Sequence, residues 1–586
     1  MSAQPTRQTR PGAPTILNGL VSISTLLIVA ILAVHVSSAP PPTIAELQPQ
    51  VKQQILEAPD AQAARNGPGQ RGNSGLGPES SPSPSGDAAA AGASGATTLP
   101  SPSPSIQVPR LLRCTGNPAI QTPDPQSPPC SNYFDPKLDN GGATYPGVTR
   151  DFIYVAWPNL GGFVEHENDP NGADVALLAQ YFNNHFQFYN RKIKILSYDP
   201  SAGAFGQPTV AQMQQDAAKV AKQLNPGPGV FASLSYPNAN GSEHYYYDAL
   251  GKQNYHILSV NSVETASTEA FLASQAPYEW STVPGLDFAE QNVASMICNT
   301  LKGKTPAYVG SPAPGSTWSA TRRFGLTYSR ESDGTYPDRG PLINGMNACR
   351  APIVYNQEVN GNSSQVAVDL KNAGVTSVLC TCAGVVLSSI MQAAAQQQYF
   401  PEWIVQSYGF QEKDSTAYNG AGNQSSYPAS QENRQIIGMT YENRFTAPEQ
   451  QFWYQALREV DPSYSYGDNV ADIYDYYRYE ELMVIAAGIQ LAGPNLTPQS
   501  FSDGLTRAQF PDPGHGQAPY YQALVGFGAG KHSFFADAAP VWYGTQDQNY
   551  TSAEPRTGSF CYVDRGLRFA AGQWPAALDF FQEPCR

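Results

Sequence analysis

Residues 377–405 read SVLCTCAGVVLSSIMQAAAQQQYFPEWIV, and this stretch contains the pattern that decides the fold. The apolar runs at 377–380 and 403–405 have the length of buried strands, and the segment 386–397 between them has the apolar spacing of a helix. A strand, a helix and a second strand in this order form a parallel strand pair with a right-handed crossover. The stretch therefore predicts a parallel α/β sheet.

The same alternation extends to both sides of this stretch. Further strands are expected at 152–157, 193–198, 230–233, 256–260, 307–310 and 353–355, and helices at 174–186, 213–224, 243–250, 288–301 and 365–373. Two more helices, 449–460 and 472–492, precede polar β-like segments at 533–543 and 558–564. Gly374 is well placed to end the helix before it. Two successive series of strands and helices predict an α/β protein with two doubly wound, Rossmann-like lobes.

The N-terminal residues predict export. Arg7 and Arg10 precede an apolar run at 16–36, which is long enough to span a bilayer with its N-terminus in the cytoplasm. Two interpretations stay open. The run is either an uncleaved transmembrane signal-anchor behind a basic cytoplasmic stub (1–15), or a signal peptide cleaved at the small residues 37–39. Both place the remaining chain outside the cytoplasm, tethered to the plasma membrane or secreted.

Composition separates the start of the chain from its globular part. Residues 39–105 are rich in Pro, Ser, Gly and Ala, so we expect a disordered linker there. Residues 106–147 resemble a proline-rich, disulfide-tied preface to the lobes. The formal net charge of −14, with only 14% charged residues among 586, argues against a nucleic-acid partner.

Eight cysteines agree with an oxidising compartment, and disulfides are the expected state. The expected pairs are Cys114–Cys130, Cys561–Cys585 and Cys298–Cys349. Cys380 and Cys382 remain, either as a bonded turn or as two thiols. Zinc is the rival interpretation, but C-x-C without a second cluster is poor ligand spacing. No metal or cofactor is expected.

Four short segments carry a family resemblance. They are residues 147–155 (GVTRDFIYV), 190–195 (NRKIKI, with Tyr189 before it), 284–287 (PGLD) and 394–403 (AAQQQYFPEW). Their order over 147–586 resembles the type I periplasmic-binding-protein family, in particular the leucine/isoleucine/valine-binding and amide-binding substrate-binding proteins of ABC transporters. The resemblance implies a three-segment hinge between the lobes. It places lobe 1 at 148–283 and 443–525, and lobe 2 at 284–442 and 526–586.

The residues themselves suggest where a ligand could bind. Loop 233–242 (SLSYPNANGS) precedes the helix expected at 243–250, whose first backbone N–H groups would favour an anion. Trp157 lies at the end of the first strand and could form an apolar wall of the site, although packing in the core is equally consistent. In sheets of this kind ligands bind at the carboxyl ends of the strands.

The resemblance adds candidates to these. It implies carboxylate contacts from Ser235, Ser242 and Ser262, and it places Asp287 near a substrate ammonium group. An ordinary turn with a serine cap, and an N-terminal helix cap at Asp287, are the alternatives. Tyr408 stands where several relatives have an acidic ligand contact, which weakens an assignment to α-amino acids.

The expected function is therefore capture of a small organic solute, such as an amino acid or amide, and its delivery to an ABC transporter permease. A membrane-tethered sensing ectodomain of the same fold is the alternative. The sequence contains no nucleophile elbow, phosphate-binding loop or metalloprotease motif, so no catalytic residue and no enzymatic activity are expected.

Overall fold

The computed structural model describes residues 114–116, 119–159, 173–201, 208–236, 243–262, 267–306, 321–330, 337–422, 435–442, 446–465, 471–507, 527, 532–533, 537–548 and 557–581. The expected membrane segment 16–36, the linker 39–105 and the first part of the preface lie outside these residues. Among the helices that are described, none is both long enough and apolar enough to cross a bilayer.

The first sheet has five parallel strands in the order β2-β1-β3-β4-β5. The strands are β1 (Phe152–Pro158), β2 (Lys192–Tyr198), β3 (Ala232–Ser233), β4 (Leu258–Asn261) and β5 (Glu279–Ser281). The helices around it are α3 (Ala173–His185), α4 (Val210–Lys219) with its continuation Val220–Leu224, α5 (His244–Asp248) with Ala249–Gln253, α6 (Glu269–Ser274), α12 (Phe452–Val460), α13 (Ala471–Ala492) and α14 (Pro498–Arg507). We call this sheet and its helices lobe 1.

The second sheet has seven strands in the order β12-β11-β10-β9-β8-β6-β7. The strands are β6 (Phe324–Tyr328), β7 (Ile353–Glu358), β8 (Ser377–Thr381), β9 (Glu402–Val405), β10 (Ile436–Thr440), β11 (Ala539–Gln548) and β12 (Thr557–Tyr562). The helices are α7 (Leu286–Met296) with Ile297–Leu301, α8 (Gly340–Ala348), α9 (Ser363–Asn372), α10 (Gly384–Gln396) and the short α11 (Asp414–Ala417). This sheet and its helices form lobe 2.

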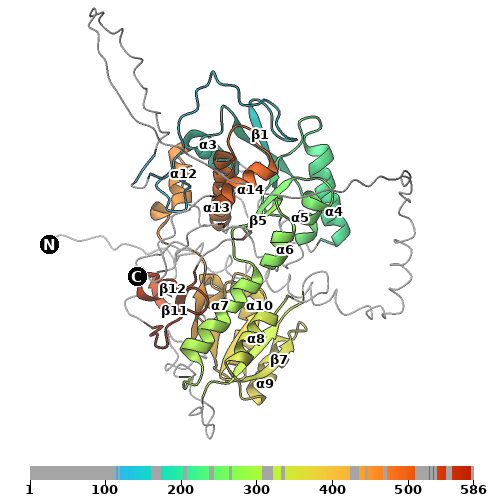
Figure 1. The fold of residues 1–586 in the computed structure, drawn as a ribbon. Coiled ribbons are helices and arrows are strands. Elements are labelled where there is room, and N and C mark those ends of the chain that lie inside the picture. The colour runs from blue at the N-terminus through green and yellow to red at the C-terminus, as the bar shows by residue number, and fades with distance from the viewer. Residues whose placement is uncertain are drawn as a thin grey trace, which may run out of the picture. The chain divides into compact units, whose positions relative to one another are not determined.

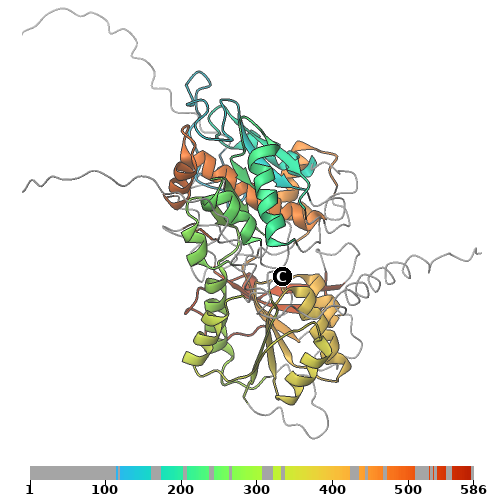
Figure 2. The same ribbon diagram turned by 90° about the vertical axis from the view of Figure 1, so that its right-hand side faces the viewer.

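The two sheets share one topology. The parallel strands of lobe 2 follow the order β7-β6-β8-β9-β10, which repeats the order of lobe 1, and the antiparallel β11 and β12 extend it. Each sheet carries helices on both faces. In lobe 2, α7 and α8 cover one face and α9 and α10 the other (Figure 2). The predicted α/β architecture with two doubly wound parallel sheets is thus what the structure contains.

Burial on both faces explains the apolar strand sequences. In β8, Leu379 packs in the α7 side of the core, whereas Val378 and Cys380 pack on the α9 and α10 side. In β9, Ile404 and Trp403 divide in the same way. A strand that is covered on both faces needs apolar side chains at successive positions, which is why the runs do not alternate with polar residues.

The helix that precedes Gly374 ends as its sequence predicts. Gly374 adopts φ +65°, a left-handed conformation that glycine enters without steric cost. The N–H of Val375 donates to the carbonyl of Leu370 at 3.1 Å, which satisfies an otherwise unpaired carbonyl of the last turn. The chain then enters β8 directly.

The chain passes between the lobes three times. Lobe 1 contributes β1 to β5 and later α12 to α14, and these two blocks alternate along the sequence with the two blocks of lobe 2. Helices α12 and α13 accordingly lie beside α3 although they are far away in sequence (Figure 1). Near the last passage, the N–H of Ser281 at the end of β5 donates to the carbonyl of His532 at 2.9 Å.

Some strand boundaries differ from the sequence prediction. Strand β4 begins at Leu258 and not at His256, because His256 has a left-handed φ of +57° that interrupts an extended chain. Strands β5, β6 and β10 were not predicted. The strand expected at 307–310 lies outside the described residues.

Disulfides join Cys114 to Cys130 and Cys298 to Cys349, two of the three pairs expected from the sequence. Cys380 and Cys382, whose pairing the sequence left open, are bonded to each other at the end of β8 and are buried. Cys561 is also disulfide-bonded. Cys585, its expected partner, lies outside the described residues.

Candidate functional site

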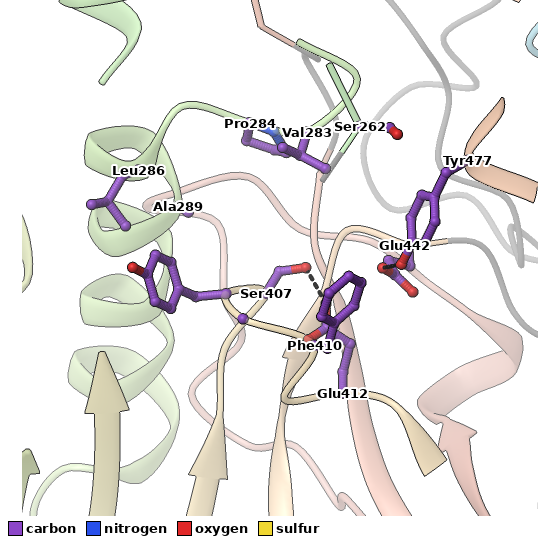
Figure 3. Close-up of a pocket in the computed structure, with 12 residues that line it drawn as sticks. Ser262, Val283, Pro284, Leu286, Ala289, Ser407, Phe410, Glu412, Glu442 and Tyr477 are labelled. Atoms are coloured by element: carbon purple, nitrogen blue, oxygen red, sulfur yellow. Dashed lines mark hydrogen bonds between the residues drawn. The ribbon is translucent and has the colours of Figure 1, made fainter. Parts of the chain in front are cut away.

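A pocket lies where loops of both lobes meet, with about 440 Å³ of space that protein atoms do not fill (Figure 3). Its lining consists of Ser262, Val283, Pro284, Leu286, Ala289, Ser407, Tyr408, Gly409, Phe410, Glu412, Glu442 and Tyr477. Apart from Tyr477 of α13, the lining follows the carboxyl ends of parallel strands or begins α7. This is the position at which doubly wound sheets place their ligands.

Four different strands supply the lining loops. Ser262 directly follows β4, and Val283 and Pro284 follow β5 in lobe 1. In lobe 2, the loop 407–412 follows β9, and Glu442 comes two residues after β10. Because parallel strands end at the same edge of a sheet, residues that are far apart in sequence converge here.

Hydrogen bonds and one glycine fix the loop that follows β9. Gly409 has φ +68°, and its carbonyl accepts from the N–H of Gly384 at the start of α10. The Nε2 of Gln411 donates to the carbonyls of Cys380 and Cys382 at 2.6 and 2.8 Å. The loop is therefore tied to the disulfide-bonded turn after β8, so its side chains have a defined position.

Glu412 is the most unusual side chain of the pocket. Only 8% of the residue is exposed, and its Oε1 accepts from the Ser407 hydroxyl at 2.5 Å. Its Oε2 is buried and has no hydrogen-bond partner in the described part of the chain. Burial, with a further contribution from the negative charge of Glu442, raises the pKa of Glu412 to about 7. The pocket thus holds a carboxyl group that is poised between its protonated and charged forms at neutral pH.

Glu442 is held from several sides. Its carboxylate forms an ion pair with Lys413 and accepts from the Tyr477 hydroxyl at 3.0 Å. Its backbone carbonyl accepts from Arg568 at 2.7 Å. The Lys413 ammonium group lies 5.0 Å from the centre of the Tyr477 ring, within cation–π range. Lys413 thereby neutralises the Glu442 carboxylate without being part of the pocket lining.

A second, smaller pocket adjoins the first and shares Glu412 and Glu442 with it. Its remaining lining is Asp414, Thr440, Val541, Ser559, Phe560 and Tyr562. The carboxylate of Asp414 accepts from the N–H of Phe560 at 2.7 Å. Glu412 and Glu442 therefore lie between the two pockets, at the carboxyl ends of the parallel strands of lobe 2.

The lobe 1 side of the site contains an internal carboxylate. Glu481 of α13 accepts from the hydroxyl groups of Ser235 and Ser262, and from the N–H of Ser235 at 3.2 Å. Nη1 of Arg478 lies 3.0 Å from each of its carboxylate oxygens, and both side chains are almost fully buried. Two of the three serines that the resemblance assigns to a ligand carboxylate thus bind a carboxylate of the protein itself.

The other predicted site residues have different surroundings. Tyr408 lines the pocket. Trp157 is 1% exposed, belongs to the lobe 1 core and lines neither described pocket, so its position agrees with the packing alternative. Asp287 is the second residue of α7, whose N-cap is Gly285, so it is not the N-terminal cap that the alternative expected. Its Oδ1 accepts from the N–H groups of Glu269 and Phe288 at 2.8 and 3.0 Å. Ser242 lies outside the described residues.

Four polar residues of the site were not predicted: Ser407, Glu412, Glu442 and Tyr477. The first two follow a strand that was predicted, so the polar loop after Val405 was a usable signal. Glu442 follows the unpredicted β10. Tyr477 belongs to a predicted helix, but nothing in its spacing distinguishes it from the buried tyrosines around it. No group of ligating side chains suited to a metal ion is present in the described residues.

Comparisons with known proteins found matches among solved structures. No protein-family model matches the chain, and no curated protein matches it. Solved structures that match include a solute-binding protein of an ABC transporter from Rhodopseudomonas palustris HaA2 in complex with p-hydroxybenzoic acid, at 10% identity over 73% of this chain and 98% of that chain, with a TM-score of 0.46.

Two other matches are transporter substrate-binding proteins with bound amino acids. The one from Streptococcus pneumoniae, in complex with isoleucine, has 10% identity over 70% of this chain and 99% of that chain, with a TM-score of 0.43. The one from Desulfitobacterium hafniense, in complex with leucine, has 15% identity over the same shares and a TM-score of 0.42. All three are binding proteins of transporters.

Proposed function

We propose that the protein captures a small organic solute in the pocket between its lobes and delivers it to an ABC transporter permease. The observation that carries this proposal is the convergence of loops from both parallel sheets on one pocket. Ser262 and Tyr477 come from lobe 1, whereas Tyr408 and Glu412 come from lobe 2. A solute that contacts both sets favours a closed arrangement over an open one, and a transporter can recognise that difference.

The lining has the character of a solute site. Aromatic and aliphatic side chains form most of it, and a few hydroxyl and carboxyl groups are placed among them. Pockets that bind small molecules have this composition, because apolar walls supply affinity and a few polar groups fix orientation. The proposed lobe boundaries, at 283/284, 442/443 and 525/526, let the passages between lobes act as the hinge.

The proposal includes a location outside the cytoplasm, with the N-terminal segment as a membrane tether or as a cleaved signal. Three described disulfides and a further disulfide-bonded cysteine, Cys561, support an oxidising compartment.

The test uses the protein from residue 114 onward, purified from an oxidising host. Thermal unfolding is measured against a library of amino acids, amides, amines, sugars and aromatic acids, and small-angle scattering follows the best solutes. A binding protein should melt at a higher temperature with at least one solute and become more compact with it. Failure of every solute to change either quantity would contradict the proposal.

A further inference from the structure

The charged side chains that line the two pockets are acidic. In the described residues these are Glu412 and Glu442, together with Asp414 in the smaller pocket. Lys413 and Arg568, which bind the carboxylate and the backbone carbonyl of Glu442, are not part of either lining. Among the described residues, the two linings therefore offer a ligand acidic side chains and no cationic side chain.

Glu412 supplies the second, independent observation. More than nine-tenths of the residue is buried, it lines both pockets, and its Oε2 has no partner among the described residues. A buried oxygen without a partner is unfavourable, because it has lost its water and gained nothing in exchange. A ligand N–H group would satisfy it, and a charged donor forms the stronger bond.

Two serines of lobe 1 that the resemblance assigns to a ligand carboxylate, Ser235 and Ser262, are already in use. The hydroxyls of Ser235 and Ser262, the N–H of Ser235 and the Arg478 guanidinium all bind the carboxylate of Glu481. A ligand carboxylate would have to displace Glu481 and leave its buried charge unpaired, which is costly. The site thus has an unsatisfied acceptor for a cation in Glu412, whereas Ser235 and Ser262 are not available to a ligand anion.

Aromatic rings complete the surroundings of a cation. Phe410 and Tyr477 line the larger pocket together with Glu412 (Figure 3). Tyr408 also belongs to its lining. The faces of Phe410 and Tyr477 already attract the Lys413 ammonium group, at 5.9 and 5.0 Å from their ring centres. Rings of this kind stabilise organic cations better than anions.

We infer that the pocket takes an organic cation that bears no carboxylate, an amine or a guanidine, with its N–H group bonded to Oε2 of Glu412 and its carbon chain against the aromatic side chains. This inference rests on the proposed function and narrows it to one class of solute. The inferred solute differs from a zwitterionic amino acid in lacking a carboxylate, because Glu481 of the protein already binds the serines that could hold one.

The test compares solutes that share a carbon skeleton and differ in charge. Isothermal titration calorimetry is run with 3-methylbutylamine, leucine and 4-methylpentanoate, and with corresponding sets built on the butyl, phenylethyl and guanidinobutyl skeletons. In at least one set, the cation should bind at least 10-fold more tightly than the zwitterion and the anion. Glu412→Gln should weaken that cation at least 10-fold, whereas Glu449→Gln, at an exposed site, should leave its affinity unchanged.

A second readout separates a direct contact from a structural effect. At pH 6, where Glu412 is largely protonated, cation binding should release close to one proton, measured from the dependence of the heat on the buffer. Glu412→Gln should abolish this release while the variant melts within a few degrees of the parent.

The outcomes distinguish this inference from the proposed function. Tightest binding of zwitterions or anions, with Glu412→Gln without effect, would overturn the inference and leave solute capture standing. If no solute of any charge bound, the proposed function and the inference would both fail.

Discussion

Removal of the internal carboxylate in lobe 1 gives the sharpest energetic prediction. In the parent, Nη1 of Arg478 lies 3.0 Å from both carboxylate oxygens of Glu481. In Glu481→Gln, the guanidinium keeps its buried position but loses this negatively charged partner. Their side chains are 4% and 0% exposed, so water cannot compensate for the loss. Breaking one partner of a buried ion pair costs about 3–5 kcal/mol, and we expect that loss in the free energy of unfolding.

The double variant Arg478→Met/Glu481→Gln separates the cost of an unpaired guanidinium from the other effects of replacing Glu481. It removes the uncompensated guanidinium, so it should be at least about 2 kcal/mol more stable than Glu481→Gln alone. Urea unfolding, followed by tryptophan fluorescence at pH 7, measures all variants, with Glu449→Gln as the exposed control. A loss below about 1 kcal/mol in Glu481→Gln would refute the reasoning, as would additive effects of the two substitutions.

Three further predictions concern the pocket and the disulfides. Burial raises the pKa of Glu412 from 4.5 to about 7, so the folded state keeps a proton that the unfolded state loses. The free energy of unfolding should therefore fall between pH 4.5 and 7 by roughly 3 kcal/mol more in the parent than in Glu412→Gln. Equal pH dependence of this free energy in the two proteins would contradict the prediction. In Gly409→Ala the new Cβ would lie 2.6 Å from Cα of Ala383, and with φ +68° we expect a loss of about 2 kcal/mol or more and weaker solute binding; an unchanged urea midpoint would be inconsistent with this contact. Replacement of Cys298 and Cys349 by serine opens a loop with a sequence separation of 51 residues and should cost about 2–4 kcal/mol; a melting temperature that matches the parent's would contradict it.

The sequence was most informative where one physical requirement dominates. Burial on both faces makes β8 and β9 continuous apolar runs, and these were predicted within a residue or two. Gly374 ended its helix as expected because few other residues adopt its φ without strain. Such features depend on local chemistry, so they can be predicted without the tertiary structure.

The missed strands show where local reasoning stops. Strand β5 has three residues and begins with Glu279, whose side chain is buried against its normal preference. Its strand character comes from pairing with β4, and pairing between distant segments leaves little trace in a short sequence. The same limit applies to β10, which carries Gly438 at its centre.

The site was predicted less well than the fold, for a related reason. Ser235 and Ser262 were correctly expected at strand ends, but their partner Glu481 lies more than two hundred residues away on a helix. The sequence could not single out Glu412 as a site residue, because its unsatisfied oxygen and its raised pKa arise only from burial beside Glu442. Contacts of this kind depend on how the lobes are assembled, and no spacing rule encodes them.

The central claim is that one pocket, built from the strand-end loops of both sheets, holds the solute. A crystal structure of the protein with the solute that raises its melting temperature most would test this claim directly. We predict density for the solute in contact with Glu412 and Tyr408 from lobe 2 and with Ser262 or Tyr477 from lobe 1. A solute that is bound elsewhere, or that touches one lobe alone, would contradict the account.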